Sequence, residues 1–289
     1  MRAALVAALT LVAPSCHRPP PPTNPRYVLG APYQVGGVWY YPRERYELQE
    51  TGLATVYPSG HAELTADGEA FDQTALAAAH QTLQLPAIAR VTNLENGRQV
   101  LVRINDRGPA TPHRLIEITR RTAVLLDFPA DGVARVRVAV QPTESYAAVD
   151  GVQGAPRLEL STAPLGAVQQ SELPPPGGVT PVIAAASAPL QPPAEAAATT
   201  DPRLPEAVTQ ASPEPGNLFV QLGTFQTFAY ADIQRARVAA LGARIVSTRE
   251  GRVQTHRVII GPFTSVQQAD TVLDQVVLAG VTDSRIVVE

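Results

Sequence analysis

Val102-Arg-Ile-Asn105-Asp106-Arg107-Gly108-Pro109 is the stretch of the chain that joins an apolar run directly to a polar turn. The apolar residues predict a strand, and the Gly-Pro pair predicts the turn at which that strand ends. Asp106 is therefore expected at the rim of a sheet, where a long, chain-like ligand can pass. Residues 64–72 (Leu-Thr-Ala-Asp-Gly-Glu-Ala-Phe-Asp), continued by residues 77–80 (Ala-Ala-Ala-His), form a second stretch with more polar residues than a turn requires.

The segment around these two stretches, residues 50–141, predicts a mainly β domain. Turn signals such as Pro-Ser-Gly at 58–60 and Glu-Asn-Gly at 95–97 separate short apolar runs. Helices are expected at the Ala-rich residues 74–83 and, behind a Thr cap, at 119–126. Strands are expected at residues 53–57, 87–92, 99–104 and 134–140. About six strands and two helices within roughly 90 residues indicate a small closed barrel.

The C-terminal segment, residues 216–289, contains an internal repeat. Val220-Gln-Leu-Gly-Thr-Phe225 returns 38 residues later as Val258-Ile-Ile-Gly-Pro-Phe263. Each copy precedes an amphipathic helix and a further strand, so two βαβ halves predict an α+β, ferredoxin-like domain. The expected apolar faces of the two helices consist of Ile233, Ala236 and Ala240, and of Val266, Ala269, Leu273 and Val276.

Two segments flank the barrel. Residues 142–215 hold half of the 28 prolines, are rich in alanine and nearly lack aromatic residues, so they predict a long disordered linker. Residues 27–49 are rich in tyrosine and hold the only tryptophan, Trp39. They predict an extended arm, with a hairpin around Gly36-Gly37, that packs on the barrel.

The N-terminus has the pattern of an export signal. Met1-Arg2 precedes an apolar run that ends at Pro14-Ser15-Cys16, which predicts a signal peptide over residues 1–15. A cysteine after a small residue at this point resembles a bacterial lipobox, in which the thiol is lipidated, and Pro-rich residues 16–26 then act as a spacer. A plainly secreted form and a misassigned start are the alternatives. We expect a lipid-anchored protein on the periplasmic side of the cell envelope.

Composition excludes several classes of function. The formal net charge of −3 gives no electrostatic footprint for nucleic acid. Cys16 is the only cysteine, so neither an intrachain disulfide nor a thiolate metal cluster can form. The sequence has no Gly-rich phosphate loop, paired metal-ligand histidines or Gly-x-Ser-x-Gly elbow. We therefore expect no cofactor and no metal.

Three side chains are candidates for chemistry: Glu69, His80 and Asp106. Cleavage of a glycosidic bond needs a carboxyl group that is protonated when it meets the bridging oxygen, and nearby groups can raise its pKa. The alternative is structural: Asp106 caps a turn, Glu69 is a solvated acid and His80 caps a helix. His61, His113 and His256 are interpreted as structural.

Longer motifs resemble the rare lipoprotein A family. They are Thr65-Ala-Asp-Gly-Glu69, Ala77–Leu83, Arg90–Gly97 and Val102–Pro109, and the resemblance covers residues 50–140. It implies a double-psi β-barrel and lytic transglycosylase (lyase) activity, with Asp106 as the key acid and with Glu69 and His80 as supporting residues in the same pocket. Residues 54–58 (Ala-Thr-Val-Tyr-Pro) depart from the family's Ser-Trp-Tyr-Gly stretch, and Glu117 replaces its Asp.

The C-terminal repeat resembles the sporulation-related (SPOR) domain, which implies binding to peptide-poor glycan strands at the division septum, near division proteins. Two non-enzymatic alternatives remain: an expansin-like glycan binder, and a docking platform for division proteins. The sugar-binding residues that the two resemblances imply are Thr65, Asn105 and Arg107 in the barrel, and Gln221, Thr224 and Arg257 in the SPOR-like domain.

Overall fold

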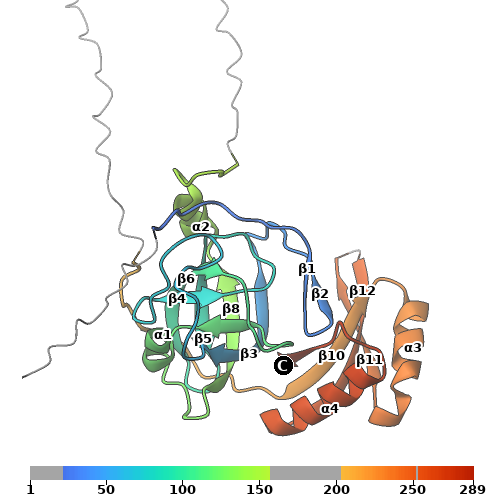
Figure 1. Cartoon of the computed structure of the whole chain (residues 1–289). Helices are drawn as coiled ribbons and strands as arrows, with labels where there is room; N and C mark the ends of the chain where they lie inside the picture. The colour runs from blue at the N-terminus through green and yellow to red at the C-terminus, as the bar shows by residue number, and fades with distance from the viewer. Residues whose placement is uncertain (1–21, 157–202, 252) are drawn as a thin grey trace, which may run out of the picture. The chain divides into compact units, whose positions relative to one another are not determined.

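The computed structural model describes residues 22–156, 203–251 and 253–289 (Figure 1). Within them, residues 22–155 and 203–289 belong to one compact unit. The expected signal peptide, the lipidation site Cys16 and most of the expected linker lie outside the described residues. No helix in the described part of the chain is both long enough and apolar enough to span a bilayer.

Six strands close into the barrel that the sequence predicts. They follow the order β4-β7-β3-β8-β5-β6, and β6 pairs back onto β4. The pairs β3–β7 and β4–β6 are parallel and the others are antiparallel, so the sheet is mixed. The strands are β3 (Gln49–Val56), β4 (Ala77–Ala79), β5 (Ala87–Asn93), β6 (Arg98–Asp106), β7 (Ile116–Ile118) and β8 (Val133–Val140).

The barrel interior follows from alternation along its strands. In β8, every second residue from Ala134 to Val140 is buried, whereas Arg135 and Arg137 point outward. Successive side chains of a strand point to opposite faces, so this pattern buries one apolar row and solvates the other. Equivalent rows from the other strands fill the barrel and include Ala89, Val91, Val100, Val102, Ile104, Ile116 and Ile118.

The expected helix over residues 74–83 is wrong, because Ala77–Ala79 form strand β4. This strand lies between β6 and β7 and pairs with both. Pairing on two sides overrides the helical preference of alanine, and the space is tight: a Cβ on Gly108 would approach the Cβ of Ala79 to 3.0 Å. The second expected helix is confirmed as α1 (Arg120–Leu125), with Thr119 as its N-cap.

The N-terminal arm contains the expected hairpin. Strands β1 (Tyr33–Val35) and β2 (Val38–Tyr40) pair around Gly36-Gly37, both of which have positive φ, as a tight hairpin turn requires. The Tyr33 hydroxyl donates to the carbonyl of Gln81 at 2.8 Å and so ties the hairpin to the barrel.

Ordered structure also extends into the segment expected to be linker, residues 142–215. Helix α2 (Pro142–Val149) has proline at its first turn, where no backbone donor is needed. Its Ser145 hydroxyl exchanges hydrogen bonds with the backbone of Ile88 at 2.9 and 3.0 Å. Strand β9 (Thr209–Gln210) pairs with the start of β6. Helix α2 and strand β9 both bond to the backbone of the barrel. The composition of residues 142–215 alone does not predict these contacts.

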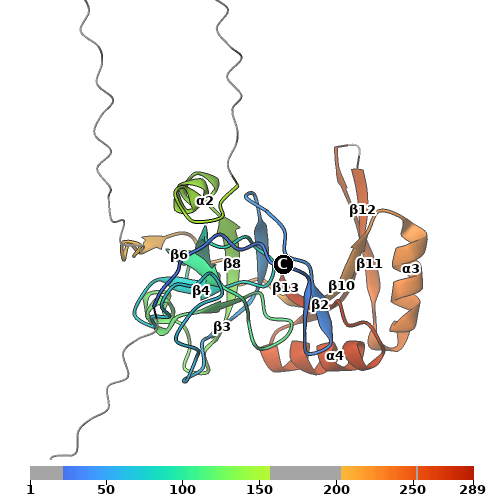
Figure 2. The same cartoon turned by 45° about the horizontal axis from the view of Figure 1, so that its top comes forward.

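The C-terminal domain has the expected ferredoxin-like order. Its antiparallel sheet runs β11-β12-β10-β13, and both helices cover one face of it (Figures 1 and 2). The elements are β10 (Leu218–Phe225), α3 (Phe228–Arg237), a short 3₁₀ turn (Ala239–Leu241), β11 (Arg244–Glu250), β12 (Val253–Phe263), α4 (Val266–Leu278) and β13 (Arg285–Val288).

The expected apolar face is confirmed for α4 and wrong for α3. Helix α4 buries Ala269, Leu273 and Val276. In α3 the buried helical residue is Ala231, and Ile233 is 56% exposed. Ala231 and the buried Val238 lie seven residues apart, two helical turns, and this spacing places Ile233 off the buried face.

Candidate active site at the barrel rim

Asp106 is the last residue of β6 and is only 5% exposed. A register shift between β4 and β6 leaves Asn105 as an extra residue just before it, and such bulges redirect side chains. One carboxylate oxygen, Oδ1, accepts hydrogen bonds from the backbone N–H groups of Ala66 and Arg107, both at 2.8 Å. These two bonds fix the orientation of the carboxyl group.

The other oxygen of Asp106, Oδ2, faces side chains only. His61 Nε2 lies 3.1 Å from it, and the Tyr57 hydroxyl lies at 3.4 Å. The Nδ1 atom of His61 lies 3.1 Å from the carbonyl of Ala62. If Nδ1 carries the proton and donates to that carbonyl, Nε2 is free to accept one from Oδ2. The pair can therefore hold a proton between Asp106 and His61.

Aromatic rings surround this proton site. The His61 ring stacks on Phe71 with centroids 4.1 Å apart, and Tyr57 contacts both rings edge-on. Burial, reinforced by the charge of Asp106, raises the pKa of the Tyr57 hydroxyl, which stays protonated and can donate. Burial and the Asp106 charge also raise the pKa of Glu117, although the backbone N–H of Ala110 opposes this shift.

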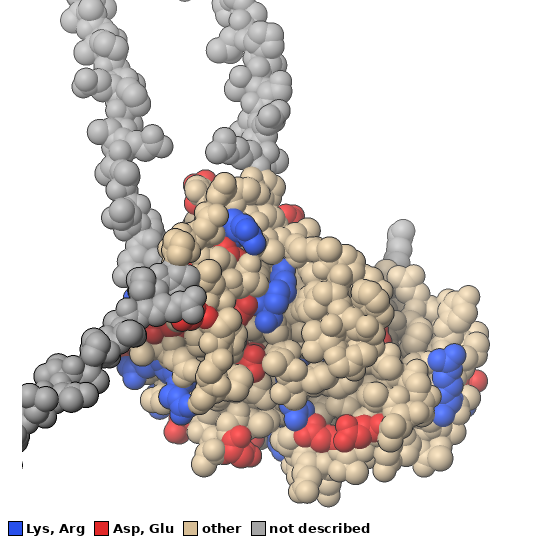
Figure 3. Space-filling view, viewed as in Figure 1, with Lys and Arg blue, Asp and Glu red and all other residues tan. Residues whose placement is uncertain are grey.

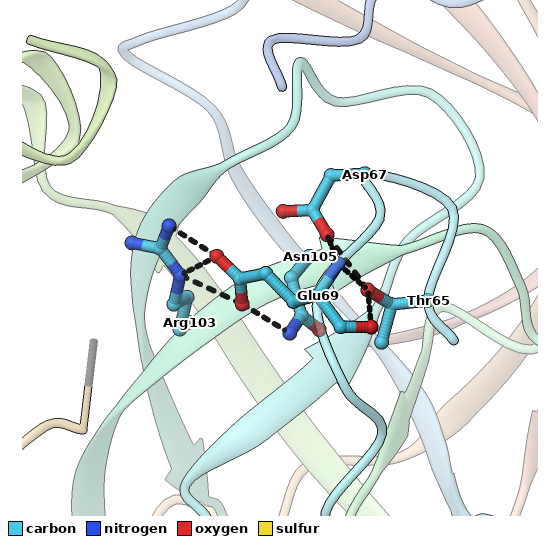
Figure 4. A network of polar contacts seen from close by, with 5 residues as sticks. All are labelled: Thr65, Asp67, Glu69, Arg103 and Asn105. Atoms are coloured by element: carbon cyan, nitrogen blue, oxygen red, sulfur yellow. Dashed lines mark hydrogen bonds and ion pairs between the residues drawn. The ribbon is translucent and has the colours of Figure 1, made fainter. Parts of the chain in front are cut away.

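Glu69 belongs to a different network, shown in Figure 4. Its carboxylate accepts from Arg103 Nε at 2.8 Å and from Asn105 Nδ2 at 2.8 Å. The Thr65 hydroxyl lies 2.7 Å from Asp67 Oδ1 and 3.1 Å from the Glu69 backbone nitrogen. Glu69 thus fixes the residue before Asp106.

Asp67 is the unusual member of that network. Burial, and then the charge of Glu69, raise the pKa of its carboxyl from 3.8 to about 7. Its Oδ1 accepts from Thr65 and from the backbone N–H of Glu69, whereas Oδ2 has no partner among the described residues. A carboxyl group in this setting is poised to hold a proton near neutral pH.

His80 follows β4 and is almost fully buried. Its Nδ1 accepts from the backbone N–H groups of Thr82 and Leu83 at 3.2 and 3.3 Å. Burial lowers the pKa of the ring to about 4, so the ring is neutral at pH 7 and its proton lies on Nε2. In the described residues, no hydrogen bond or ion pair joins the side chains of Glu69, His80 and Asp106. The His80 backbone N–H does donate to the Asp106 carbonyl at 3.1 Å.

Arg107, expected to bind sugar, uses its guanidinium inside the protein. It donates to the carbonyls of Leu83 at 2.6 Å and Leu29 at 2.7 Å, with longer bonds to those of His80 and Val28. These bonds connect the end of β6 to the arm.

In the C-terminal domain, the three expected sugar-binding residues lie together. Gln221 Nε2 donates to the Thr224 hydroxyl at 3.1 Å, and Thr224 lies opposite Arg257 in the β10–β12 pairing. Arg257 also forms an ion pair with Glu289.

Sequence reasoning missed His61 and Tyr57 as partners of Asp106. The available signal was a tyrosine and a histidine four residues apart, around a Pro-Ser-Gly turn shortly before the polar residues 64–72. No group of three or more His, Cys, Asp or Glu side chains in the described ranges is arranged to hold a metal ion.

The chain matches two family models in the expected order. One, described as "Lytic transglycolase", matches residues 49–138, and the other, described as "SPOR domain", matches residues 214–286. A solved structure of the RlpA SPOR domain from Pseudomonas aeruginosa is similar at 23% identity and a TM-score of 0.23, covering 25% of this chain and 99% of that one.

Several relatives carry the name endolytic peptidoglycan transglycosylase RlpA. The one from Pseudomonas aeruginosa is 32% identical over 266 residues, which span 89% of this chain and 76% of the relative. The Campylobacter jejuni protein is 45% identical over 112 residues (38% of this chain, 40% of the relative). The Rickettsia bellii protein is 38% identical over 116 residues (39% and 51%). Because the first match covers most of both proteins at 32% identity, and both family models match this chain, the chain belongs to the RlpA family of endolytic peptidoglycan transglycosylases.

Proposed function

We propose that this chain cleaves peptidoglycan glycan strands internally, between N-acetylmuramic acid and N-acetylglucosamine, with Asp106 as the catalytic acid and base. The observation that carries the proposal is that the two oxygens of the Asp106 carboxyl have different partners. Backbone donors hold Oδ1, while Oδ2 faces His61 Nε2 at 3.1 Å in a largely buried site. A carboxyl arranged in this way can gain and lose a proton without moving.

The reaction needs no water. Protonated Asp106 Oδ2 gives its proton to the glycosidic oxygen, and the bond from that oxygen to C1 of the muramyl residue breaks. The muramyl 6-hydroxyl then attacks C1 and returns a proton to Oδ2. The products are a new N-acetylglucosamine end and a 1,6-anhydro-N-acetylmuramic acid end, and Asp106 is protonated again.

Other residues act by position. Glu69 holds Asn105 through its carboxylate, and His80 holds the Asp106 carbonyl through its backbone N–H. Both contacts are to the backbone or neighbour of Asp106 rather than to its carboxyl group. We assign Glu69 and His80 a positioning role. We assign His61 the role of sharing the proton of Asp106.

The C-terminal domain would bring the barrel to its substrate. Gln221, Thr224 and Arg257 supply neighbouring polar groups on β10 and β12 that suit the hydroxyl and amide groups of a glycan strand. We propose peptide-poor strands as the substrate and the division septum as the site of action. Lipidation of Cys16 would anchor the protein to an envelope membrane.

Removal of the Asp106 carboxyl tests the mechanism. We expect Asp106→Asn to lower the release of anhydro-muramyl ends from amidase-treated sacculi by about 10³-fold or more, as measured by mass spectrometry. Binding to the same sacculi should persist. Asp131→Asn, which changes an exposed acid before β8, is the matched control and should retain activity. Equal product from Asp106→Asn and the unmodified chain would exclude Asp106 as the acid.

A second candidate function is non-catalytic glycan binding. Two observations favour it: Asp106 is covered by Tyr57 and His61, and residues 54–58 lack the tryptophan of the Ser-Trp-Tyr-Gly stretch named above. A binder would leave no new ends in the same assay, even at high protein concentration, yet would still sediment with the glycan. The mass spectrum of the digested strands therefore separates the two functions.

A further inference from the structure

A pocket of about 470 Å³, whose lining does not include Asp106, is formed by the arm, the barrel and residues of the C-terminal domain. This volume falls in the range typical of small-ligand sites. The arm contributes Trp39 and Tyr41, and the barrel contributes His80 and Gln81. The wall also includes Gln221 and Thr224, the polar residues of β10 described above. We call this space the arm pocket.

The hairpin presents its aromatic rings from a fixed base. Val38 is buried, and Tyr33, anchored to Gln81, contacts the ring of Tyr40 with centroids 5.5 Å apart. In contrast, Trp39 is 53% exposed and Tyr41 is 62% exposed. Large exposed aromatic rings on a rigid hairpin provide flat apolar faces on which a pyranose ring can stack at low entropic cost.

His80 supplies a buried donor that the protein itself leaves unused. The side chain is 2% exposed and lines the arm pocket, and Nε2 has no partner in the described part of the chain. Both backbone bonds to Nδ1 leave the proton on Nε2, as described above. A buried polar group without a partner is costly, so such a group commonly marks a place that a ligand or water fills.

Charge on the wall indicates the chemistry of the ligand. Of the arginines that the arm and barrel contribute, Arg45 pairs with Glu50 at 3.0 Å and Arg114 pairs with Asp270 at 2.7 Å. Arg43 is exposed, and no ion pair involves it among the described residues. Two acids also line the pocket: Glu50, which pairs with Arg45 and Arg285, and Asp283, which comes from the C-terminal domain. On the arm side the pocket offers one uncommitted guanidinium, that of Arg43, which suits a carboxylate.

The rest of the surface does not explain an attraction for anions. The whole chain has a net charge of −3, and acidic and basic side chains are interspersed on the face shown in Figure 3. A preference for an anionic ligand must therefore arise locally, at a site such as Arg43. Screening at physiological salt limits the reach of any more distant charge to about 8 Å.

We propose that the arm pocket binds an N-acetylmuramic acid residue whose lactyl carboxylate is free, with Arg43 paired to the carboxylate and Trp39 stacked on the sugar ring. His80 Nε2–H donates to an oxygen of the same residue. In peptide-substituted glycan the lactyl carboxyl is an amide, so the pocket distinguishes stripped strands from substituted ones by charge. The inference rests on the proposed glycan substrate. It adds that Arg43 is the group that distinguishes strands without peptide from strands with peptide.

The test compares binding of two glycans that differ only in charge. The full chain carrying Asp106→Asn is used so that the strands stay intact. One ligand is peptide-free glycan from amidase-treated sacculi, and the other is the same glycan with its carboxylates converted to carboxamides. We call the Asp106→Asn chain the parent. We expect the parent to bind the carboxylate form about tenfold more tightly than the carboxamide form, which is the gain that one charge-assisted hydrogen bond provides. Adding Arg43→Gln should bring the two dissociation constants close together.

Matched variants locate the effect. Arg120→Gln removes an exposed arginine of α1 that has no ion pair in the described residues, and it should keep the parent's preference. Arg43→Lys should recover part of the preference. Trp39→Ala should weaken binding of both glycans by a similar factor, because stacking does not depend on the carboxylate.

An unchanged ratio of the two dissociation constants in Arg43→Gln overturns the inference, as does a parent that binds neither glycan. The outcome is independent of cleavage, because the binding protein lacks the Asp106 carboxyl. If the charge preference disappears with Arg43 while the Asp106 test yields no anhydro ends, the pocket assignment stands and the enzymatic function fails.

Discussion

At the scale of single residues, the site depends on one carboxyl group with two different oxygens. Asp106 Oδ1 is held by two backbone N–H groups, while Oδ2 lies in a covered space beside His61. His61 adds a nitrogen that can take or return the proton, and Tyr57 adds a weaker hydroxyl contact at 3.4 Å. In the proposed mechanism these three side chains share the proton, and His61 is the closer partner of Asp106.

We expect His61→Phe to lower the rate of anhydro-end release by about 100-fold, because the proton-sharing nitrogen is lost. Phenylalanine keeps a ring that can stack on Phe71, so the loop should hold its place. Tyr57→Phe should cost less than about tenfold, since its bond to Asp106 is long. Initial rates on peptide-free glycan measure both. The reverse order of the two effects would assign the proton to Tyr57 instead.

At the scale of elements, the sequence predicts strands well where they bury one face. β8 alternates along its whole length, and β3, β5 and β6 end at clear turn signals, so their existence follows from local pattern. β4 does not follow, because three alanines carry a helical preference and only pairing with β6 and β7 makes them a strand. Local pattern cannot report a partner that is distant in the chain.

The same limit applies to the candidate site. Asp106 was identifiable because its motif is local and its neighbours in sequence are polar. His61 reaches it from 45 positions earlier, through a loop whose path depends on the Ala66 N–H bonding to Oδ1. Glu69 and His80 were expected beside Asp106, yet their side chains bond to Asn105 and to the backbone after β4. Spacing along the chain gave proximity but not side-chain direction.

Arg107 determines how firmly the arm is held. Its guanidinium donates to backbone carbonyls on both the arm and the loop after β4, among them those of Leu29 and Leu83. Arg107→Lys cannot satisfy this set, so we expect about 2 kcal/mol lower unfolding free energy and faster hydrogen exchange in residues 22–48. Urea unfolding and exchange mass spectrometry measure these effects. Arg90→Lys, which loses one long contact to Gln141, is the control. Unchanged exchange in the arm would show that other contacts hold it.

At the scale of the whole molecule, several ionisable groups are buried together. Asp67, His80, Asp106 and Glu117 are each less than a tenth exposed. Of these, Asp67 has a raised pKa near 7 and His80 a lowered one near 4. Burying such groups costs stability whenever the pH favours their charged forms. The site's chemistry should therefore be visible in how the unfolding free energy depends on pH.

The two groups act in opposite directions. The His80 pKa falls from 6.5 to about 4 on folding, so His80 lowers the unfolding free energy as the pH drops through that range. The Asp67 pKa rises from 3.8 to about 7 on folding. The stability that Asp67 contributes to the folded protein is therefore fully present below about pH 4 and is lost as the pH rises through 7. Between these limits the effects partly cancel in the unmodified chain, and the loss due to Asp67 continues to about pH 8.

Asp67→Asn removes only the second contribution. We expect the unfolding free energy of the variant, relative to the unmodified chain, to increase with pH by about 1 kcal/mol per unit between pH 4.5 and 7, and to level off above pH 8. The asparagine oxygen can still accept from Thr65 and from the Glu69 N–H. Urea unfolding from pH 4.5 to 8.5 measures the difference, with Asp131→Asn as an exposed control. Parallel curves for the variant and the unmodified chain would show that Asp67 is charged in the folded protein at neutral pH, and that its network holds the charge without cost.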